Sequence, residues 1–458
     1  MTNINPLSIE SIAVTDLFGS YDYSISTSRE DPDGRKVLIL YGDNGGGKTT
    51  ILKIAFHLIA SETTSGHKGT VARIPFRSFV IVFSDGTRIE AERLGKDIVG
   101  SFTMSLHIKG RKKIVIEWEA EAPNYKVKAK SDKQDRQQDD FLAEAQRLGL
   151  ALYFLTDNRQ LHVSGANSGL TIPWDHSPSS FLLLSDRELL EEDIFNRRNT
   201  TDKIDPEAIA KYLLRKSMKI AHNSIQLQAM SGTSKGDSSV NALYGEVLKR
   251  LTGSGTAAFQ EPTSAKADMV VRLKRIESSC SEYAKYDLMP KFVAEQFLST
   301  VALAEPHQMS VFSHVLKPYL ESLEKKLEAL SQLYGKVDAF VNLINRFYTN
   351  KQLRFTLQQG FTIHTTAGKE LDPSFLSSGE RHLMLLFCNS LAALDRPSIM
   401  MIDEPEISLN VKWQRILVQS LLELVAESPI QYIFCTHSIE LLAKHRNLTS
   451  KLVNLRGH

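Results

Sequence analysis

The chain has 458 residues, of which 42% are hydrophobic and 24% charged, with 55 Lys and Arg against 53 Asp and Glu. This composition excludes an intrinsically disordered, collagen-like or disulfide-scaffold protein, and the small net charge excludes a chain that is basic throughout. At roughly 100–200 residues per domain, the length predicts two or three domains. The N-terminus has no signal pattern and no apolar run approaches the ~20 residues of a spanning helix, so we expect a cytoplasmic protein without a membrane partner.

Residues 9–26 predict two short strands around a turn at Gly19. The apolar run Val37-Leu38-Ile39-Leu40 is typical of a buried parallel strand, and a glycine cluster follows it directly. Residues 49–61 then place their apolar side chains at helical spacing. The order strand, glycine loop, helix is therefore predicted near the N-terminus.

The period changes to two between residues 78 and 119, which predicts four antiparallel strands joined by turns at Asp85-Gly86 and Lys109-Gly110. We interpret this stretch as an antiparallel β lobe inserted after the first helix. Residues 131–140 are polar and predict a mobile loop, and residues 150–155 predict another buried strand.

A helical block follows, with connectors expected at residues 231–240 and 252–257. Ser185 with Glu188 fits a capping box, and Asp205-Pro206 fits a helix start. The strongest helical pattern spans residues 311–347. Its apolar stripe favours a helix packed in an α-helical lobe, and an exposed coiled-coil arm is the alternative.

Strands resume at residues 353–357 and 361–366. A helix is then expected over 378–394, a buried strand over 399–402, a helix over 412–426 and a last buried strand over 432–435. The two ends of the chain therefore predict an α/β fold, and the middle predicts an inserted β lobe and a helical insertion.

The glycine cluster matches the pattern G-x-x-x-x-G-K-[ST] of a phosphate-binding loop, in the strand–loop–helix context that this motif requires. Backbone N–H groups and the helix N-terminus would bind phosphate oxygens. Lys48 would bridge the β- and γ-phosphates and Thr49 would ligate Mg²⁺. The residues expected to bind the nucleotide here are Gly42, Asn44, Gly45, Gly46, Gly47, Lys48, Thr49 and Thr50.

Two further buried strands end in polar residues. Asp403 and Glu404 follow one, and His437 follows the other. Because parallel strands deliver their carboxyl ends to one crevice, Asp403 is expected to hold Mg²⁺ and Glu404 to act as the general base on water. His437 is expected to contact the γ-phosphate, although a histidine at a strand end is often only structural.

Leu376-Ser377-Ser378-Gly379-Glu380 precedes an apolar-faced helix. Serine and glycine at a helix start offer hydrogen-bond donors to an anion. The same residues also fit an ordinary serine N-cap with glutamate in the first turn. The residue chemistry alone leaves both interpretations open.

The phosphate loop, LSSGE, IDEPEISL and THS occur in the order of an ABC-type ATPase. The sequences of these motifs resemble the SMC/OLD-like (AAA15-like) branch most, through IAVTDLFGSYDYSI, YGDNGGGKTTIL and IDEPEISLN. That branch includes ATPase subunits of bacterial anti-phage systems such as PARIS and Septu. The chain resembles the PARIS subunit first and the Septu subunit second. The motifs cover roughly residues 8–60 and 353–440.

The resemblance implies a head that binds ATP and Mg²⁺ and works as a head-to-tail dimer or higher oligomer. Ser377, Ser378 and Gly379 of one head would then contact the nucleotide held by Lys48 of the other. Gln160 is the candidate Q-loop residue. We expect four segments in the chain: an N-terminal head segment (1–70), a β lobe with return strand (71–175), a helical insertion (176–350) and a C-terminal head segment (351–458).

By the same resemblance, the function is an ATPase subunit of an anti-phage complex that senses a phage protein and controls a nuclease effector encoded nearby. The alternative is an SMC-like DNA-binding ATPase of repair or genome maintenance, and a nucleotide-gated scaffold with negligible turnover is a third hypothesis. The alternative would use a basic face, which could equally be a solvated surface: Lys109, Arg111, Lys112, Lys113, Lys126, Lys128 and Lys130.

Overall fold

The computed structural model describes residues 7–27, 34–60, 66–121, 125–129, 132–157, 161–164, 206–236, 264–303, 306–426 and 428–457. The chain divides into a first unit, Met1–Lys216 with Leu376–His458, and a second unit, Ser217–Phe375. Helix α6 (Pro206–Gly236) crosses one boundary, and the other lies directly before Leu376. The four segments expected from the sequence stay a prediction. No described helix is long and apolar enough to cross a bilayer.

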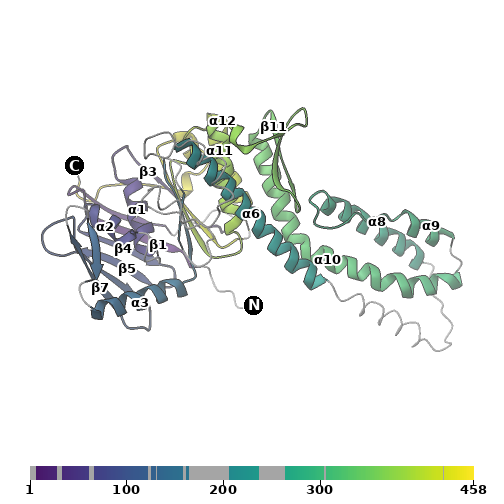
Figure 1. The fold of residues 1–458 in the computed structure, drawn as a ribbon, viewed down its shortest axis with the longest axis horizontal. Coiled ribbons are helices and arrows are strands. Elements are labelled where there is room, and N and C mark those ends of the chain that lie inside the picture. The colour runs from purple at the N-terminus through teal and green to yellow at the C-terminus, as the bar shows by residue number, and fades with distance from the viewer. Residues whose placement is uncertain are drawn as a thin grey trace, which may run out of the picture. The chain divides into compact units, whose positions relative to one another are not determined.

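The first unit contains a seven-stranded antiparallel sheet in the order β2-β1-β4-β5-β6-β7-β8 (Figure 1). The predicted β lobe is present, but it is continuous with the N-terminal hairpin because β1 pairs with both β2 and β4. The strands are β1 (Ile9–Leu17), β2 (Tyr21–Ser26), β4 (Ser78–Phe83), β5 (Arg88–Arg93), β6 (Phe102–His107), β7 (Ile114–Glu121) and β8 (Lys126–Ala129).

A second sheet of the first unit has the order β10-β9-β14-β15-β3-β16, and all its neighbours are parallel except β10 and β9. Its central strands are buried on both faces, which explains their unbroken apolar sequences. The strands are β3 (Val37–Tyr41), β9 (Ala151–Leu155), β10 (Leu161–Ser164), β14 (Ser398–Asp403), β15 (Ile430–Thr436) and β16 (Thr449–Lys451).

Helix α1 is almost fully buried, because the core around it draws residues from both sheets. Ile51 and Leu52 share this core with Phe79 of one sheet and Ile433 of the other. The opposite face of the parallel sheet is covered by α11. The helices of this unit, besides the start of α6, are α1 (Lys48–Ile59), α2 (His67–Arg73), α3 (Asp132–Arg147), α11 (Ser378–Ala393), α12 (Val411–Leu424) and α13 (Ile439–Leu442), with a 3₁₀ turn η3 (Arg446–Leu448).

The prediction of a mobile loop at residues 131–140 is wrong, because 132–140 belong to α3. The polar composition hid a helix that buries Phe141 in the core. Its C-terminal half is also tied by charge, since Glu144 accepts hydrogen bonds from Arg111 and from Arg147. A polar stretch can therefore be helical when a few apolar residues anchor one face.

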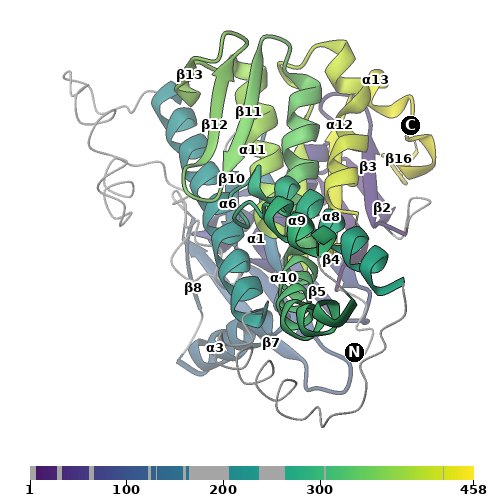
Figure 2. The same cartoon turned by 90° about the vertical axis from the view of Figure 1, so that its right-hand side faces the viewer.

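The second unit contains α8 (Ser264–Ala284), α9 (Glu295–Leu303) and the 42-residue α10 (Pro306–Phe347), which continues through Pro318 and Gly335 (Figure 2). It also holds β11 (Lys351–Thr356), β12 (Gly360–Thr365), β13 (Glu370–Leu371) and a 3₁₀ turn η2 (Pro373–Phe375). As predicted for a helical lobe, α10 packs on α8: Arg272 donates to Glu324 at 2.6 and 2.7 Å, and Tyr283 stacks on Tyr334.

The connector expected at residues 231–240 is partly wrong, because α6 continues to Gly236. A side chain at Gly232 would meet Leu330 of α10 at 2.8 Å, so the glycine lets these two helices approach closely. Gly232 therefore serves the packing of α6 on α10. The expected capping box at Ser185, the residue Asp205 and the connector at 252–257 lie outside the described residues.

Arg93 is a buried cation in the antiparallel sheet, with 4% of its surface exposed. Its guanidinium donates hydrogen bonds to the carbonyl oxygens of Phe76, Gly100, Val71 and Ile74 and stacks on the Phe76 ring. Burial lowers its pKa to about 10. The side chain thus closes the segment between α2 and β4 by satisfying backbone carbonyls.

We expect Arg93→Leu to lower the free energy of unfolding by at least ~3 kcal/mol, because four carbonyl oxygens each lose one hydrogen bond. Arg88→Leu is the matched control, since Arg88 lies on the same strand and is exposed. Its loss should stay within ~0.5 kcal/mol. Urea unfolding of both variants measures the difference, and equal losses would contradict the assignment.

Three buried histidines surround the C-terminal half of α1. Nδ1 of His57 lies 2.9 Å from Nδ1 of His67, and the two rings pack near Phe56 with His162. Burial, followed by the charges of the neighbouring histidines and of Lys53 and Lys68, lowers the pKa of His57 well below its usual value. His57 is therefore neutral in the folded chain at neutral pH.

Because the unfolded chain binds this proton near pH 6.5 and the folded chain binds it only at lower pH, stability is retained above pH 6.5 and falls as the pH drops below it. We expect the melting temperature to decrease between pH 7 and pH 5, and His57→Gln to flatten that slope. The exposed His107→Gln is the control and should leave the slope unchanged. Calorimetry across this range checks the sign.

Candidate active site

The carboxyl ends of three parallel strands meet at one edge of the six-stranded sheet. The register pairs Asp403 of β14 with Cys435 of β15, and Thr436 with Tyr41 of β3. The strand that carries the histidine thus lies between the strand of the phosphate loop and the strand of the acidic pair. The three motifs are brought together as the sequence predicted.

The phosphate loop has the geometry of an anion site. Gly47 is the N-cap of α1 at φ 84°, without a side-chain cap, and the first turn contains no acid. The helix N-terminus is therefore available to a negative group. A Cβ at Gly47 would meet Leu17 at 2.7 Å, so this position requires glycine for its backbone angle and for space.

Lys48 is buried beneath this loop. Its Nζ donates hydrogen bonds to the carbonyl oxygens of Gly42 at 2.7 Å and Asp43 at 3.0 Å, which holds the ammonium inside the curve of the loop. The other predicted loop residues differ in exposure: Asn44, Gly45 and Thr49 are exposed, and Gly46, Gly47 and Thr50 are half-buried. The loop thus offers backbone and side-chain groups at its open side.

Two supports of the loop were not predicted. The Tyr23 hydroxyl donates to the carbonyl oxygen of Gly46 at 2.9 Å, and burial raises the pKa of Tyr23 to about 12. From the other side, Leu452 lies close to Gly42 and Gly46. Both contacts join residues from separate segments of the chain, and no local sequence pattern predicts them.

Asp403 is fully buried, and neither of its carboxylate oxygens has a hydrogen-bond partner among the described residues. Burial raises its pKa to about 6, which the nearby Thr49 hydroxyl opposes. A buried carboxylate that lacks donors and faces a threonine hydroxyl fits a Mg²⁺ ion, which prefers oxygen ligands. Thr49 and Asp403 therefore suit the metal role predicted for them.

Glu404 leaves the strand with φ 47°, a left-handed backbone angle that non-glycine residues adopt uncommonly. This turn places its Oε2 2.5 Å from Nδ1 of His437. Burial, then contact with Glu406, raises the pKa of Glu404. Ligand atoms of Glu404, Glu406 and His437 lie within 4.8 Å of one another, and they are the one group of this kind found in the described part of the chain.

A family model described as "AAA domain, putative AbiEii toxin, Type IV TA system" matches residues 37–443. The chain belongs to this AAA-domain family. The matched range contains the phosphate loop, the acidic pair and His437. Family membership supports an ATPase of the ABC or AAA type that binds a nucleotide. It does not by itself assign the chain to an anti-phage system.

Two solved structures are similar to the AAA-domain protein at 12% identity. One is the Smc head domain with an extended coiled coil bound to the C-terminal domain of ScpA, derived from Pyrococcus furiosus, with 98% of this chain and 96% of that chain covered at a TM-score of 0.41. The other is the Smc head domain with a coiled coil and joint, derived from Pyrococcus yayanosii, with 98% and 97% covered at 0.34. At these values the likeness carries no argument. The comparison with curated proteins found no match.

The LSSGE segment of the AAA-domain protein forms the capping box that the sequence left open. Ser377 accepts from the Glu380 N–H at 3.3 Å, and Glu380 accepts from the Ser377 N–H at 2.7 Å. Ser377 is nevertheless exposed and Ser378 half-buried, so both can meet a second molecule. Gly379 is buried, and a side chain there would meet the carbonyl oxygen of Ser408 at 2.6 Å.

Gln160, the predicted Q-loop residue, lies outside the described residues. The same segment contributes Asp157, which follows β9 and whose charge raises the pKa of Asp403. The end of β9 therefore faces the same group of acids. Sequence reasoning saw the polar run after this strand but selected another residue from it.

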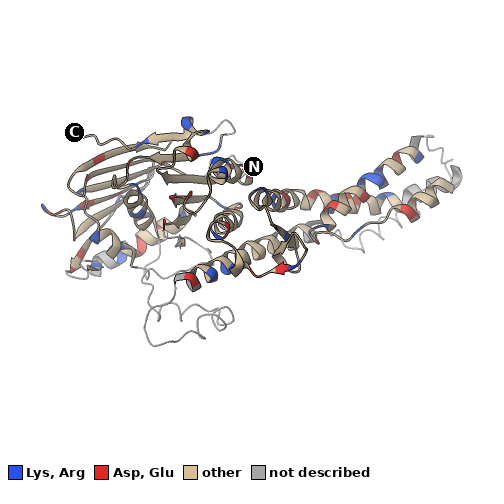
Figure 3. Ribbon diagram, turned by 90° about the horizontal axis from the view of Figure 1, so that it is seen from above, with Lys and Arg blue, Asp and Glu red and all other residues tan. Residues whose placement is uncertain are grey.

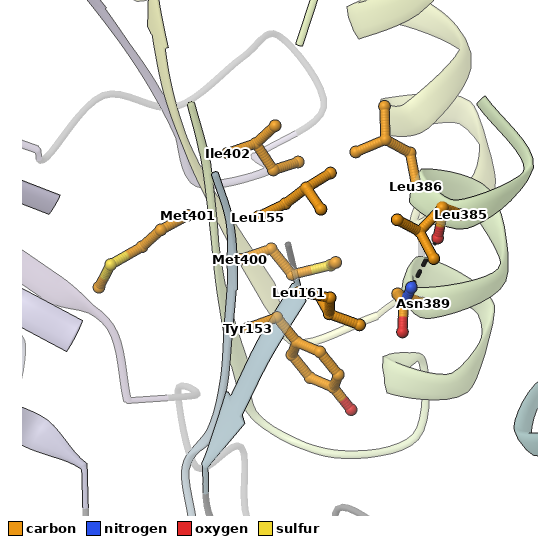
Figure 4. Close-up of a pocket in the computed structure, with 9 residues that line it drawn as sticks. All are labelled: Tyr153, Leu155, Leu161, Leu385, Leu386, Asn389, Met400, Met401 and Ile402. Carbon is orange, nitrogen blue, oxygen red and sulfur yellow. Dashed lines mark hydrogen bonds between the residues drawn. The ribbon is translucent and has the colours of Figure 1, made fainter. Parts of the chain in front are cut away.

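A small cavity lies between the parallel sheet and α11 (Figure 4). Its volume of about 10 Å³ is at most that of one water. Apolar side chains, including Leu385, Met400 and Ile402, line it together with Asn389. This cavity is a packing defect of the AAA domain and no place for a nucleotide.

The predicted basic face is less uniform than its sequence suggests. The strand register places Lys126 and Lys128 of β8 opposite Glu121 and Glu119 of β7, and Lys130 lies outside the described residues. Figure 3 shows acidic and basic positions interspersed along the ribbon. Among the described residues of this predicted face, the β6–β7 turn has several exposed lysines close in sequence, Lys109, Lys112 and Lys113.

Proposed function

We propose that this chain hydrolyses ATP with Mg²⁺ and that the ATP cycle controls a nuclease effector in anti-phage defence. The observation that carries the ATPase part is the meeting of the phosphate loop, Asp403, Glu404 and His437 at one sheet edge. The family description, with its AbiEii toxin and Type IV toxin–antitoxin terms, supports the defence part.

The chemistry follows from the positions of these groups. Lys48 and the N-terminus of α1 bind the phosphates, and Thr49 with Asp403 would hold Mg²⁺, which neutralises phosphate charge when bound. Glu404 takes the proton of the attacking water, so that ATP and water give ADP and phosphate. His437, which lies against Glu404, donates to the γ-phosphate.

The site is proposed to be completed by a second copy of the chain, whose exposed Ser377 contacts the γ-phosphate. A two-fold, head-to-tail pair gives two such sites. The second unit has no part in this chemistry, and we assign to it the contact with the effector. The ATP state would then bias which conformation, with or without effector, is populated.

The decisive experiment combines phosphate release with phage plating. Wild-type protein with its genomic neighbours should release phosphate from ATP and reduce plaque numbers, and Glu404→Gln should lose both activities. The neighbouring nuclease should co-purify with the chain. An ATPase that gives no protection against a broad phage panel would contradict the defence role and leave the ATPase role standing.

The DNA-binding alternative rests on the exposed turn lysines Lys109, Lys112 and Lys113. If they bind phosphate groups, affinity for duplex DNA should fall steeply with salt, by a log–log slope of about −0.9 for each neutralised phosphate. A filter-binding series with wild type and with all three lysines changed to glutamine tests this hypothesis. If the wild-type protein shows no salt-dependent binding to DNA, the DNA-binding hypothesis is excluded.

We also expect that this chain alone does not cut nucleic acid. Among the described residues, the one acidic and histidine group that could hold a cation belongs to the ATP site, whereas a two-metal nuclease needs a site of its own. Purified protein with Mg²⁺ or Mn²⁺ and ATP should leave plasmid DNA and tRNA intact. Metal-dependent cleavage that survives Glu404→Gln would reveal a second active site.

A further inference from the structure

Glu406 is a buried carboxylate, 5% exposed, that the proposed chemistry does not use. Its Oε1 accepts hydrogen bonds from the Thr436 hydroxyl and from the Ser438 N–H at 3.1 Å. Its Oε2 has no hydrogen-bond partner in the described part of the chain. The carboxylate is therefore held through one oxygen, and the group also lies against Glu404 and His437.

The two residues that Glu406 binds flank His437. The Ser438 N–H also lies 2.9 Å from the Thr436 hydroxyl oxygen, so that Glu406, Thr436 and Ser438 form a closed group around the histidine backbone. Ser438 then starts α13 as its N-cap and donates to Gln414 of α12 at 2.9 Å. The backbone on both sides of His437 is thus fixed.

The hydrogen bonds to Thr436 and Ser438 do not explain why residue 406 is a charged glutamate. Burying a carboxylate costs several kcal/mol unless it is compensated, and a neutral glutamine would offer Thr436 and Ser438 the same acceptor. The charge faces His437: Nδ1 lies 4.0 Å from Oε1 of Glu406 and 2.5 Å from Oε2 of Glu404. Two carboxylates therefore meet at one imidazole.

We propose that Glu406 is a positioning residue that holds His437 against Glu404, and that hydrolysis depends on it although it touches neither water nor phosphate. The hydrogen bonds fix the backbone of His437, and the charge orients its ring toward the two glutamates. This inference rests on the proposed ATP hydrolysis at the same site.

Glu406→Gln tests the charge while keeping the acceptor. We expect kcat for ATP hydrolysis to fall about 10- to 100-fold, the size usual when a group that orients a reacting residue is lost. KM for ATP should change less than about threefold, because the phosphate loop is untouched. The matched control is Glu440→Gln, the same change at a half-buried glutamate of α13 that pairs with Arg415, which should leave both constants unchanged.

A double-mutant cycle separates positioning from general damage. In a His437→Ala background, Glu406→Gln should cause little further loss, because its effect passes through the histidine. Thr436→Val, which removes one donor to Glu406, should lower kcat in the same direction by a smaller factor. Additive losses, or a parallel loss of ATP binding, would overturn the inference.

The outcomes also distinguish this inference from the proposed function. Unchanged kcat in Glu406→Gln beside an inactive Glu404→Gln overturns the role of Glu406 alone. Absence of ATP hydrolysis by the wild-type complex overturns the proposed function on which it rests. If Glu406→Gln does not fold, as judged by its melting curve, Thr436→Val decides the question. A lower kcat with a nearly unchanged KM supports the role of Glu406, and an unchanged kcat overturns it.

Discussion

Lys48→Ala should abolish ATP binding, and Glu404→Gln should retain binding but lose hydrolysis by about 10²- to 10⁴-fold. Lys48 supplies positive charge inside the phosphate loop in the ground state, and its removal leaves the phosphates without that charge. In the proposed chemistry Glu404, at the end of β14 beside His437, acts on water and not on the bound nucleotide.

Calorimetric titration with Mg²⁺ and ATP measures binding, and phosphate release measures hydrolysis. Lys53→Ala is the control for the lysine change, since Lys53 lies on the same helix α1 outside the loop. It should keep both activities. Equal ATP affinity in Lys48→Ala and wild type would contradict the assignment of the loop.

Mixing Lys48→Ala with Ser377→Arg should restore ATPase activity that neither variant has alone. Each change damages one face of a shared site, so a mixed dimer keeps one site with two intact faces. With random exchange, half of the dimers are mixed and half of their sites are intact, which predicts up to about a quarter of wild-type activity.

Ser377 suits this experiment better than Gly379. Ser377 is exposed, whereas a side chain at Gly379 would collide with the Ser408 carbonyl oxygen of its own molecule and would test packing instead. Loss of the Ser377 cap costs only about 1 kcal/mol, which a folded domain tolerates. No recovery, with subunit exchange demonstrated by labelled protein, would count against a site shared between copies.

The site could be predicted from sequence wherever a local pattern carried the geometry. A buried strand, a glycine loop and a helix stand together in residues 37–59, and β14 ends directly in Asp403. The contacts of Tyr23 with Gly46 and of Glu406 with Thr436 join distant segments, and no spacing in the chain encodes them.

The same difference explains the fold. The strand stretches of the β lobe were visible from their period of two, but the pairing of β1 with β4 joins residues about seventy apart and makes one sheet of two predicted pieces. In α3, charged residues concealed a helix whose stability comes from burying Phe141 on tertiary contact. Sequence periodicity indicates whether a segment is a helix or a strand, whereas the segments that pack against it depend on the whole chain.

The covalent connections between the two units have a mechanical consequence. One is the uninterrupted helix α6, and the other is the peptide bond before Leu376, the residue that precedes Ser377. Tension that a bound partner exerts on the second unit is therefore shared between α6 and the segment that leads to Leu376 and the exposed Ser377. Stretching the protein between attachment points in the two units should change its rate of ATP turnover before either unit unfolds.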